Sequence, residues 1–168
     1  MLSLKNTKII FLTFILIFLS TQCKSETKVA FIQMDILINE SSAGKSLFEE
    51  LKKIDKKNKK RFKETREILN KEKKDINLKK DILSKEEYEK KIIKLNDKFK
   101  SFQADTKKSA DSLKAKRNVG MQKIINEINI LLSEYSKKNE LTFIIDQKNI
   151  IIGKSDLNIT KQILKSLK

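Results

Sequence analysis

The chain has 168 residues, which is enough for one or two domains, and its formal net charge is +16. Histidine is absent and cysteine occurs once, which excludes an intramolecular disulfide, a Cys/His zinc site and a Cys/His nucleophile pair within the chain. The carboxylate pair Glu86–Glu87 is better explained by helix capping than by acid–base chemistry. We therefore predict neither an enzyme activity nor a cofactor.

Residues 1–25 are predicted to be a secretory signal peptide. Two lysines precede the apolar run Ile9–Leu19, which is too short to cross a bilayer comfortably. Cys23 follows this run where a bacterial lipoprotein carries its lipid-modified cysteine, although Gln22 is larger than the residue expected there. Three outcomes stay open: release of a soluble protein, lipid anchoring through Cys23, and retention of the leader as an anchor. The predicted location is the periplasm, with the protein soluble or lipid-anchored.

Short apolar segments predict strands on either side of a long helical region. Lys28–Met34 is the first strand and Leu141–Asp146 the second. Residues 147–149 predict a hairpin turn that leads into a third strand, Ile150–Ile152. Asp156 is expected to cap a last short helix. Residues 26–50 and 114–168 are thus predicted to form a β-containing body, which is too small for a self-sufficient core and should therefore form an oligomer.

Residues 51–113 are predicted to form a helical hairpin arm. Ser41 or Ser42 should cap its first helix, and an apolar seam then recurs every seven residues, at Phe62, Leu69, Ile76 and Leu83. Ser84 and Glu87 make a capping box that starts the second helix. This second helix should run to Lys138, with Asn139 in the left-handed cap conformation.

The restart at Ser84 sets the register of the two helices. If the chain folds back there, residues whose numbers add up to about 168 should lie opposite each other. Ile76 then faces Ile92, and Leu69 faces Phe99.

Most of the excess positive charge lies on this arm. Residues 51–118 contain 25 Lys and Arg against 12 Asp and Glu. A basic surface attracts nucleic acid, anionic lipid headgroups or acidic proteins. The predicted leader disfavours nucleic acid, because an exported protein rarely meets it, so an anionic membrane surface or a protein partner remains.

Residues 39–46 look like a phosphate-binding loop, but they end in Gly44-Lys45-Ser46 without the first glycine of that motif, which is replaced by Asn39. The glycines of such a loop let the backbone wrap closely around a phosphate. We therefore interpret this segment as the N-terminus of a helix rather than as a nucleotide site.

The arrangement closely resembles the Skp (OmpH) family of periplasmic chaperones. The matching stretches are Lys28–Asp35, the long charged hairpin, Leu141–Asp146 and Asp156–Lys165. The resemblance implies an α+β fold in which a small β body joins three chains into a jellyfish-like homotrimer. Three helical arms would enclose a cavity that holds unfolded outer-membrane proteins without ATP. It also implies that Phe31 and Ile144 belong to the trimer body.

Two classes of function follow: a holdase chaperone, and a structural coiled-coil protein of the envelope, with or without a lipid anchor at Cys23. The strands favour the chaperone, because a spacer rod needs no β body. The residues expected to contact an unfolded client are basic side chains near the arm tip and aromatic side chains along the arm: Lys73, Lys74, Lys79, Lys80, Lys90, Lys91, Phe62, Phe99 and Phe102. The lysines also fit a solvated helix face, and the phenylalanines also fit the hairpin seam.

Overall fold

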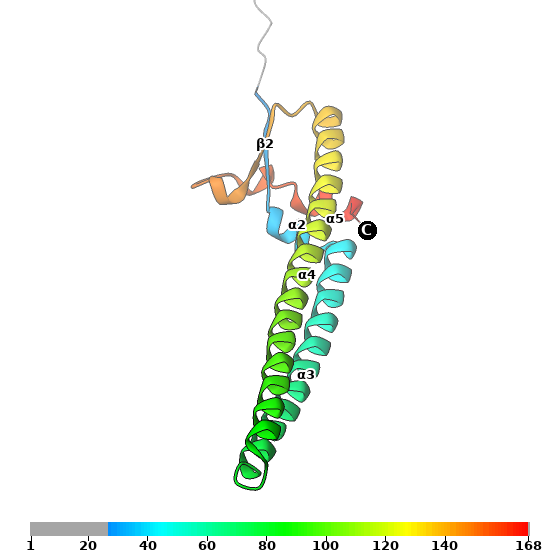
Figure 1. The fold of residues 1–168 in the computed structure, drawn as a ribbon. Coiled ribbons are helices and arrows are strands. Elements are labelled where there is room, and N and C mark those ends of the chain that lie inside the picture. Colours follow the sequence, from blue (N-terminus) through cyan, green and yellow to red (C-terminus); the bar gives the residue numbers. More distant parts are fainter. Residues whose placement is uncertain (1–26, 168) are drawn as a thin grey trace, which may run out of the picture.

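A small body sits at one end of a long two-helix arm (Figure 1). The computed structural model describes residues 27–167, so the predicted signal peptide and Cys23 lie outside the described residues. The elements, in chain order, are β1 (Val29–Ile32), α2 (Met34–Glu40), α3 (Ser42–Leu78), α4 (Lys85–Asn139), β2 (Phe143–Asp146), the 3-10 turns η1 (Gln147–Asn149) and η2 (Ser155–Leu157), and α5 (Thr160–Ser166). The fold is mostly helical, with a small two-stranded sheet, as the α+β prediction requires.

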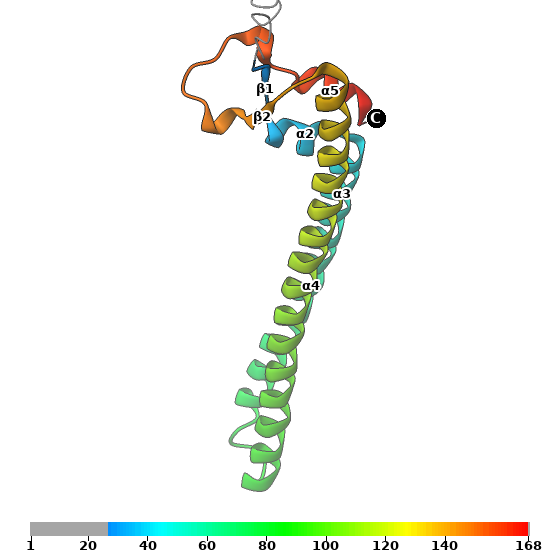
Figure 2. The ribbon, with the colours of Figure 1, turned by 90° about the horizontal axis from the view of Figure 1, so that it is seen from above.

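The arm consists of α3 and α4, which lie side by side and antiparallel over the length of α3 in both ribbon views (Figures 1 and 2). At 1.5 Å per residue, the 37 residues of α3 make an arm about 56 Å long. Helix α4 is longer, with 55 residues, and its last turns reach past the start of α3 into the body. None of the helices in residues 27–167 combines the length and the apolar character needed to cross a membrane.

The body contains a parallel sheet of two strands. Phe31 in β1 pairs with Ile145 in β2, and Phe31 also forms an isolated bridge to Asn158 on its other side. The predicted hairpin with a third strand at 150–152 is wrong for the single chain. Asp146 accepts a hydrogen bond from the Lys148 backbone, and the following residues close a 3-10 turn, so the chain leaves the sheet after β2.

The core of the body lies between this sheet, α2, α5 and the end of α4. Ala30 and Ile32 are buried on the inner face of β1. Leu37 of α2, Ile128 of α4 and Ile163 of α5 are almost fully enclosed in the same cluster. The core thus joins segments from both ends of the described chain and fixes the base of the arm.

The predicted starts of both arm helices are confirmed. The Ser41 hydroxyl accepts a hydrogen bond from the Gly44 backbone, and Ser84 and Glu87 form the complete capping box. Two details differ. The left-handed residue is Glu140 (φ 55°) rather than Asn139, and Asp156 lies in the turn η2 while α5 begins four residues later.

Candidate functional site in the helical arm

The outer half of the arm is held together by one apolar cluster between α3 and α4. Leu69, Ile76 and Leu95 are buried there. Half-buried side chains pack around them: Tyr88, Ile92, Phe99 and Phe102. Both predicted pairs, Ile76 with Ile92 and Leu69 with Phe99, therefore have both members in this cluster.

Ion pairs between the helices bear out the predicted register. Lys98 bonds to Glu72 at 2.6 Å, Arg61 bonds to Asp105 at 2.6 Å, and Lys116 pairs with Glu50. The residue numbers add up to 170 in the first pair and to 166 in the other two, which brackets the predicted value of about 168. These pairs are exposed, so they align the helices more than they stabilise them.

The three phenylalanines predicted to contact a client lie within the hairpin. Phe62 and Phe102 meet edge to face, with their ring centroids 6.0 Å apart. The guanidinium of Arg61 lies 4.7 Å from the Phe62 ring centroid, and that of Arg66 lies 6.0 Å from the Phe102 ring centroid. All three phenylalanine side chains, including Phe99, are half-buried, so they form part of the seam between the helices. Contact with a client stays a prediction for them.

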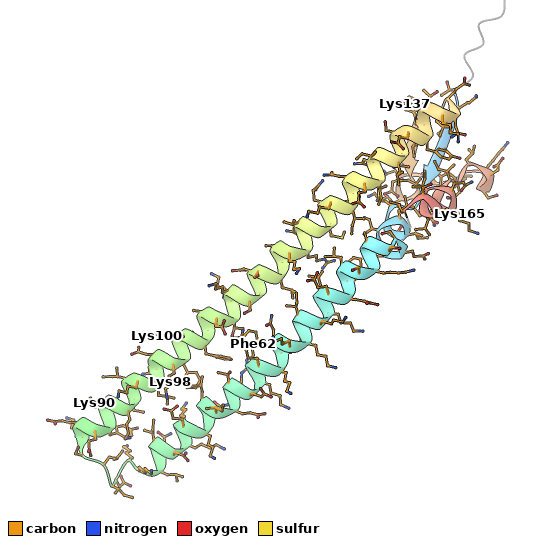
Figure 3. The ribbon with its side chains drawn as sticks, turned by 90° about the vertical axis from the view of Figure 1, so that its right-hand side faces the viewer. Phe62, Lys90, Lys98, Lys100, Lys137 and Lys165 are labelled. Atoms are coloured by element: carbon orange, nitrogen blue, oxygen red, sulfur yellow. The ribbon has the colours of Figure 1, made fainter. Side chains whose placement is uncertain are left out.

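The tip of the arm presents unpaired positive charge next to exposed apolar side chains. The six predicted lysines are exposed, and in the described chain none of them forms an ion pair: Lys73, Lys74, Lys79, Lys80, Lys90 and Lys91. Figure 3 shows Lys90 at the far end of the arm from Lys165 of the body. Leu78 and Ile82 are 79% and 83% exposed at the turn, a feature that sequence reasoning missed. The sequence did contain a signal for this exposure: the two apolar residues lie at a hairpin turn, where no other segment is available to cover them.

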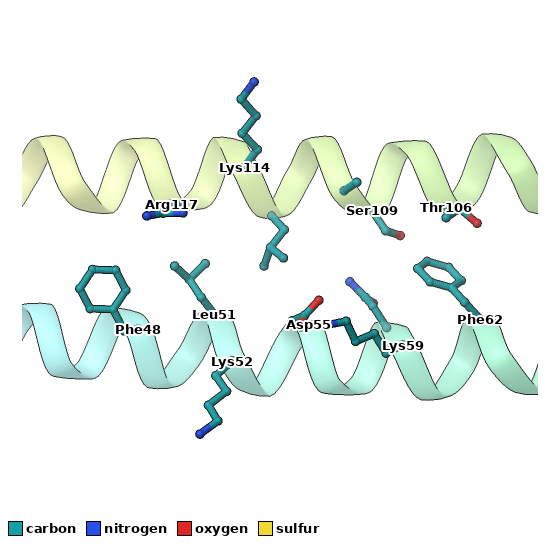
Figure 4. A pocket seen from close by; sticks show the side chains of 13 residues that line it. Phe48, Leu51, Lys52, Asp55, Lys59, Phe62, Thr106, Ser109, Lys114 and Arg117 are labelled. Carbon is teal, nitrogen blue, oxygen red and sulfur yellow. Dashed lines mark ion pairs between the residues drawn. The ribbon is translucent and has the colours of Figure 1, made fainter.

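A groove separates α3 from α4 in the half of the arm nearer the body (Figure 4). Its volume is about 630 Å³. Phe48, Leu51 and Phe62 line it from α3, and Ala110 and Leu113 line it from α4. It arises because α4 offers small side chains here, whereas the flanking parts of the arm are packed into the body core and the tip cluster.

The residues predicted to join the chains do not share one environment. Ile144 is half-buried against the body core, and Phe31 is 7% exposed, with Gly153 next to its ring. The apolar side chains that remain open are neighbours that sequence reasoning missed. Phe143 and Ile145 are 57% and 37% exposed on β2, and Ile151 and Ile152 are almost fully exposed. Within residues 27–167, strand β2 forms backbone hydrogen bonds with a neighbouring strand on one side only.

The phosphate-loop-like segment has a structural role. A Cβ atom at Gly44 would lie 1.7 Å from the carbonyl oxygen of Ile38, so only glycine allows α3 to start this close to α2. The Gly44 N–H is already bonded to Ser41. Among residues 27–167, no cluster of three or more side chains is arranged to hold a metal ion.

Comparison with known proteins agrees with this architecture. No curated protein matches the chain. A crystal structure from Caulobacter crescentus CB15, of a protein proposed to be an OmpH-like outer membrane chaperone, superposes with a TM-score of 0.77. That chain is 17% identical, and the match covers 88% of each chain, so the likeness shows a shared fold. The family model described as outer membrane protein (OmpH-like) matches residues 28–167, and the chain therefore belongs to this family, the Skp/OmpH family.

Proposed function

We propose that the protein is a periplasmic chaperone that holds unfolded outer-membrane proteins soluble without ATP. Membership of the OmpH-like family and the solved neighbour support a chaperone role. The observation that carries the proposal is the arm tip, about 56 Å from the body, which presents exposed and unpaired lysines together with two exposed apolar side chains. Such a surface attracts acidic chains from a distance and then makes weak apolar contacts that release easily.

The working form would be a homotrimer whose arms enclose the client. The open apolar side chains of β2 and of residues 151–152 support a contact between copies, because an edge strand with exposed apolar residues readily pairs with another chain. Ile145→Asp should then dissociate the oligomer in sedimentation while the helical content is kept. Ile144→Asp places a charge against the core, so it should unfold the body. An Ile145→Asp variant that keeps the size of the parent protein would contradict this placement.

The chaperone proposal is tested by diluting a urea-unfolded outer-membrane β-barrel protein and following its aggregation by light scattering. The mature protein in molar excess should suppress scattering without added ATP. Suppression should weaken as salt rises, because the screening length falls from about 10 Å at 0.1 M to about 3 Å at 1 M. Unchanged scattering, or suppression that requires ATP, would favour the structural envelope protein instead.

Charge-reversal variants distinguish an effect of the lysines at the arm tip from an effect of the net charge of the protein. The triple variant Lys74→Glu, Lys80→Glu and Lys90→Glu should lose much of the suppression and keep its oligomer, since these residues lie on the arm. The matched control reverses three exposed lysines at the body end: Lys123, Lys161 and Lys165. Equal losses in both triples would show that net charge matters rather than the tip.

The same tip supports an anionic membrane surface as a second partner. Leu78 and Ile82 could enter the headgroup region while the surrounding lysines meet anionic lipids. Vesicles containing anionic lipid should co-sediment with the protein, and Ile82→Ser should reduce the bound fraction. Equal binding to purely zwitterionic vesicles would contradict the electrostatic part of this proposal.

A further inference from the structure

The groove in the half of the arm nearer the body has the properties of a ligand site. Its volume of about 630 Å³ lies within the range of small-molecule pockets, about 300–1,000 Å³. Most of its surface is apolar: Leu51, which is only 9% exposed, lines it from α3, and the half-buried Leu113 lines it from α4. From Phe48 to Phe62 it extends about 21 Å along α3, at 1.5 Å per residue.

Its length and openness suit one alkyl chain. The hydrocarbon core of a bilayer is about 30 Å thick, so each leaflet contributes about 15 Å of extended chain. A single acyl chain therefore fits along the groove without a sharp bend. A peptide segment fits poorly. The uncharged polar side chains that line the groove are Asn58, Thr106 and Ser109, and the last two already bond to Phe102 and Arg61. Most backbone N–H and C=O groups of a bound peptide would therefore lack partners.

The charges around the groove favour an anionic headgroup. Four cations line it, Lys52, Lys59, Lys114 and Arg117, against one carboxylate, Asp55. That carboxylate is already paired with Lys59 at 2.6 Å. In Figure 4, Lys52 and Lys114 point away from the gap, whereas Arg117 lies beside it at the Phe48 end. The Arg117 guanidinium has no side-chain partner within the described residues.

We propose that this groove binds a single-chain anionic lipid of the fatty-acid class. The alkyl chain lies along Leu51 and Leu113, and the carboxylate meets the guanidinium of Arg117 at one end. A planar guanidinium can bond both carboxylate oxygens at once, which a lysine cannot do. The inference is independent of the proposed chaperone function, since it concerns a groove within one arm and no protein client.

The experiment is calorimetric titration of the mature oligomer with a saturated fatty acid and with the alcohol of the same length, both below their micelle concentrations. The acid should saturate at one site per chain and bind about fivefold more tightly than the alcohol, the upper end for an exposed ion pair. Affinity should rise about twofold for each added methylene until the groove is full. This corresponds to half the free energy gained on full burial of a methylene, because the groove is open on one side.

Two variants, each with a matched control, identify the site. Ala110→Trp fills the groove and should weaken binding of the acid at least about tenfold, whereas Ala115→Trp, on an exposed position outside the groove, should not. Arg117→Gln should bring acid and alcohol to the same affinity, whereas Arg66→Gln should keep their difference. Circular dichroism and sedimentation establish that each variant is folded and assembled.

Several results would overturn the proposal. They are a titration without saturation, equal effects of Ala110→Trp and Ala115→Trp, and an acid–alcohol difference that survives Arg117→Gln. If Ala110→Trp instead reduced only the holding of an unfolded protein and left fatty-acid binding unchanged, the groove would be a client site and the lipid assignment would be wrong.

Discussion

Replacing Gly44 by alanine should destabilise the protein although alanine is the better helix former. The new Cβ would lie 1.7 Å from the Ile38 carbonyl oxygen and 2.9 Å from its carbon, and both are backbone atoms that cannot rotate away. Ser41 fixes this approach further, because its hydroxyl donates a hydrogen bond to the Ile38 carbonyl and accepts one from the Gly44 N–H. The start of α3 must therefore move away from α2 by more than an ångström.

The magnitude follows from two opposing terms. Overpacking of this kind costs about 3 kcal/mol, and the gain in helix propensity from glycine to alanine returns about 1 kcal/mol. The net loss should be about 2 kcal/mol. Gly120 is the matched control, because the atoms nearest to a Cβ there are the two methyl carbons of Leu47, at 2.5 and 2.7 Å, and these belong to a side chain that can change its rotamer. Gly120→Ala should therefore change stability by less than about 1 kcal/mol.

Thermal unfolding followed by far-ultraviolet circular dichroism measures the difference. At about 2–4 °C for each kcal/mol in a chain of this size, Gly44→Ala should melt roughly 4–8 °C below the parent protein. All samples need the same protein concentration, because the proposed assembly would shift the melting temperature. A Gly44→Ala protein as stable as the Gly120→Ala protein would refute the close approach of α2 and α3.

Three further predictions concern the arm and its ends. Cysteines at Leu69 and Phe99 should be joined within one chain by a short thiol-reactive crosslinker, because both side chains belong to the same seam cluster. Ser84→Ala should lower the unfolding free energy by about 1 kcal/mol through loss of the capping box, measured by urea titration. Glu140→Gly should raise the melting temperature, because relief of the left-handed strain, about 1–2 kcal/mol, exceeds the exposed ion pair with Lys28 that is lost.

Each of these has a result that would contradict it. A cysteine at Leu69 that crosslinks more efficiently to position 103 than to position 99 would mean a register one turn away. For the cap, Ser84→Thr is the control, and equal loss in both variants would exclude the hydroxyl as the cause. The hydrogen bond and charge of Lys28 lower the pKa of Glu140, so this ion pair contributes above the normal pKa of the carboxyl and is lost as the pH falls through the lowered one. Glu140→Gly should therefore gain most, relative to the parent, in acid.

The arm could be predicted from sequence in detail because its signals are local. The seam spacing and the capping box at Ser84 fix both helices and their register without any distant contact. The body was harder, because its strands pair across the whole chain. Residues 150–152 are as apolar as a strand, yet β2 pairs with β1. Likewise, no residue close to Phe31 in the sequence predicts what lies against its ring, because Gly153 approaches it from far along the chain.

The groove and the role of Gly44 lay beyond sequence reasoning for a related reason. Both depend on distances between helices rather than on the pattern within one of them. The sequence indicates a helix N-terminus at Gly44, but it does not show that the Ile38 carbonyl fills the space beside this glycine. The small side chains of α4 leave a groove only because Phe48 and Phe62 of α3 line its two ends.

The parallel pairing of β1 with β2 has a consequence for the order of folding. Phe31 and Ile145 are paired although 113 residues separate them, and closing so long a flexible loop costs about 4 kcal/mol in chain entropy before any constant term. The helical hairpin should reduce this cost. If its two helices pair first, starting from the turn at Ser84, the connection between the strands is rigid and their ends are already close together. The arm should therefore form first and the sheet last, after the end of the chain has been made. Because Phe143 and Ile145, part of the exposed apolar surface, lie on that sheet, the proposed assembly would need both strands. A chain truncated before β2 should form its arm and stay monomeric.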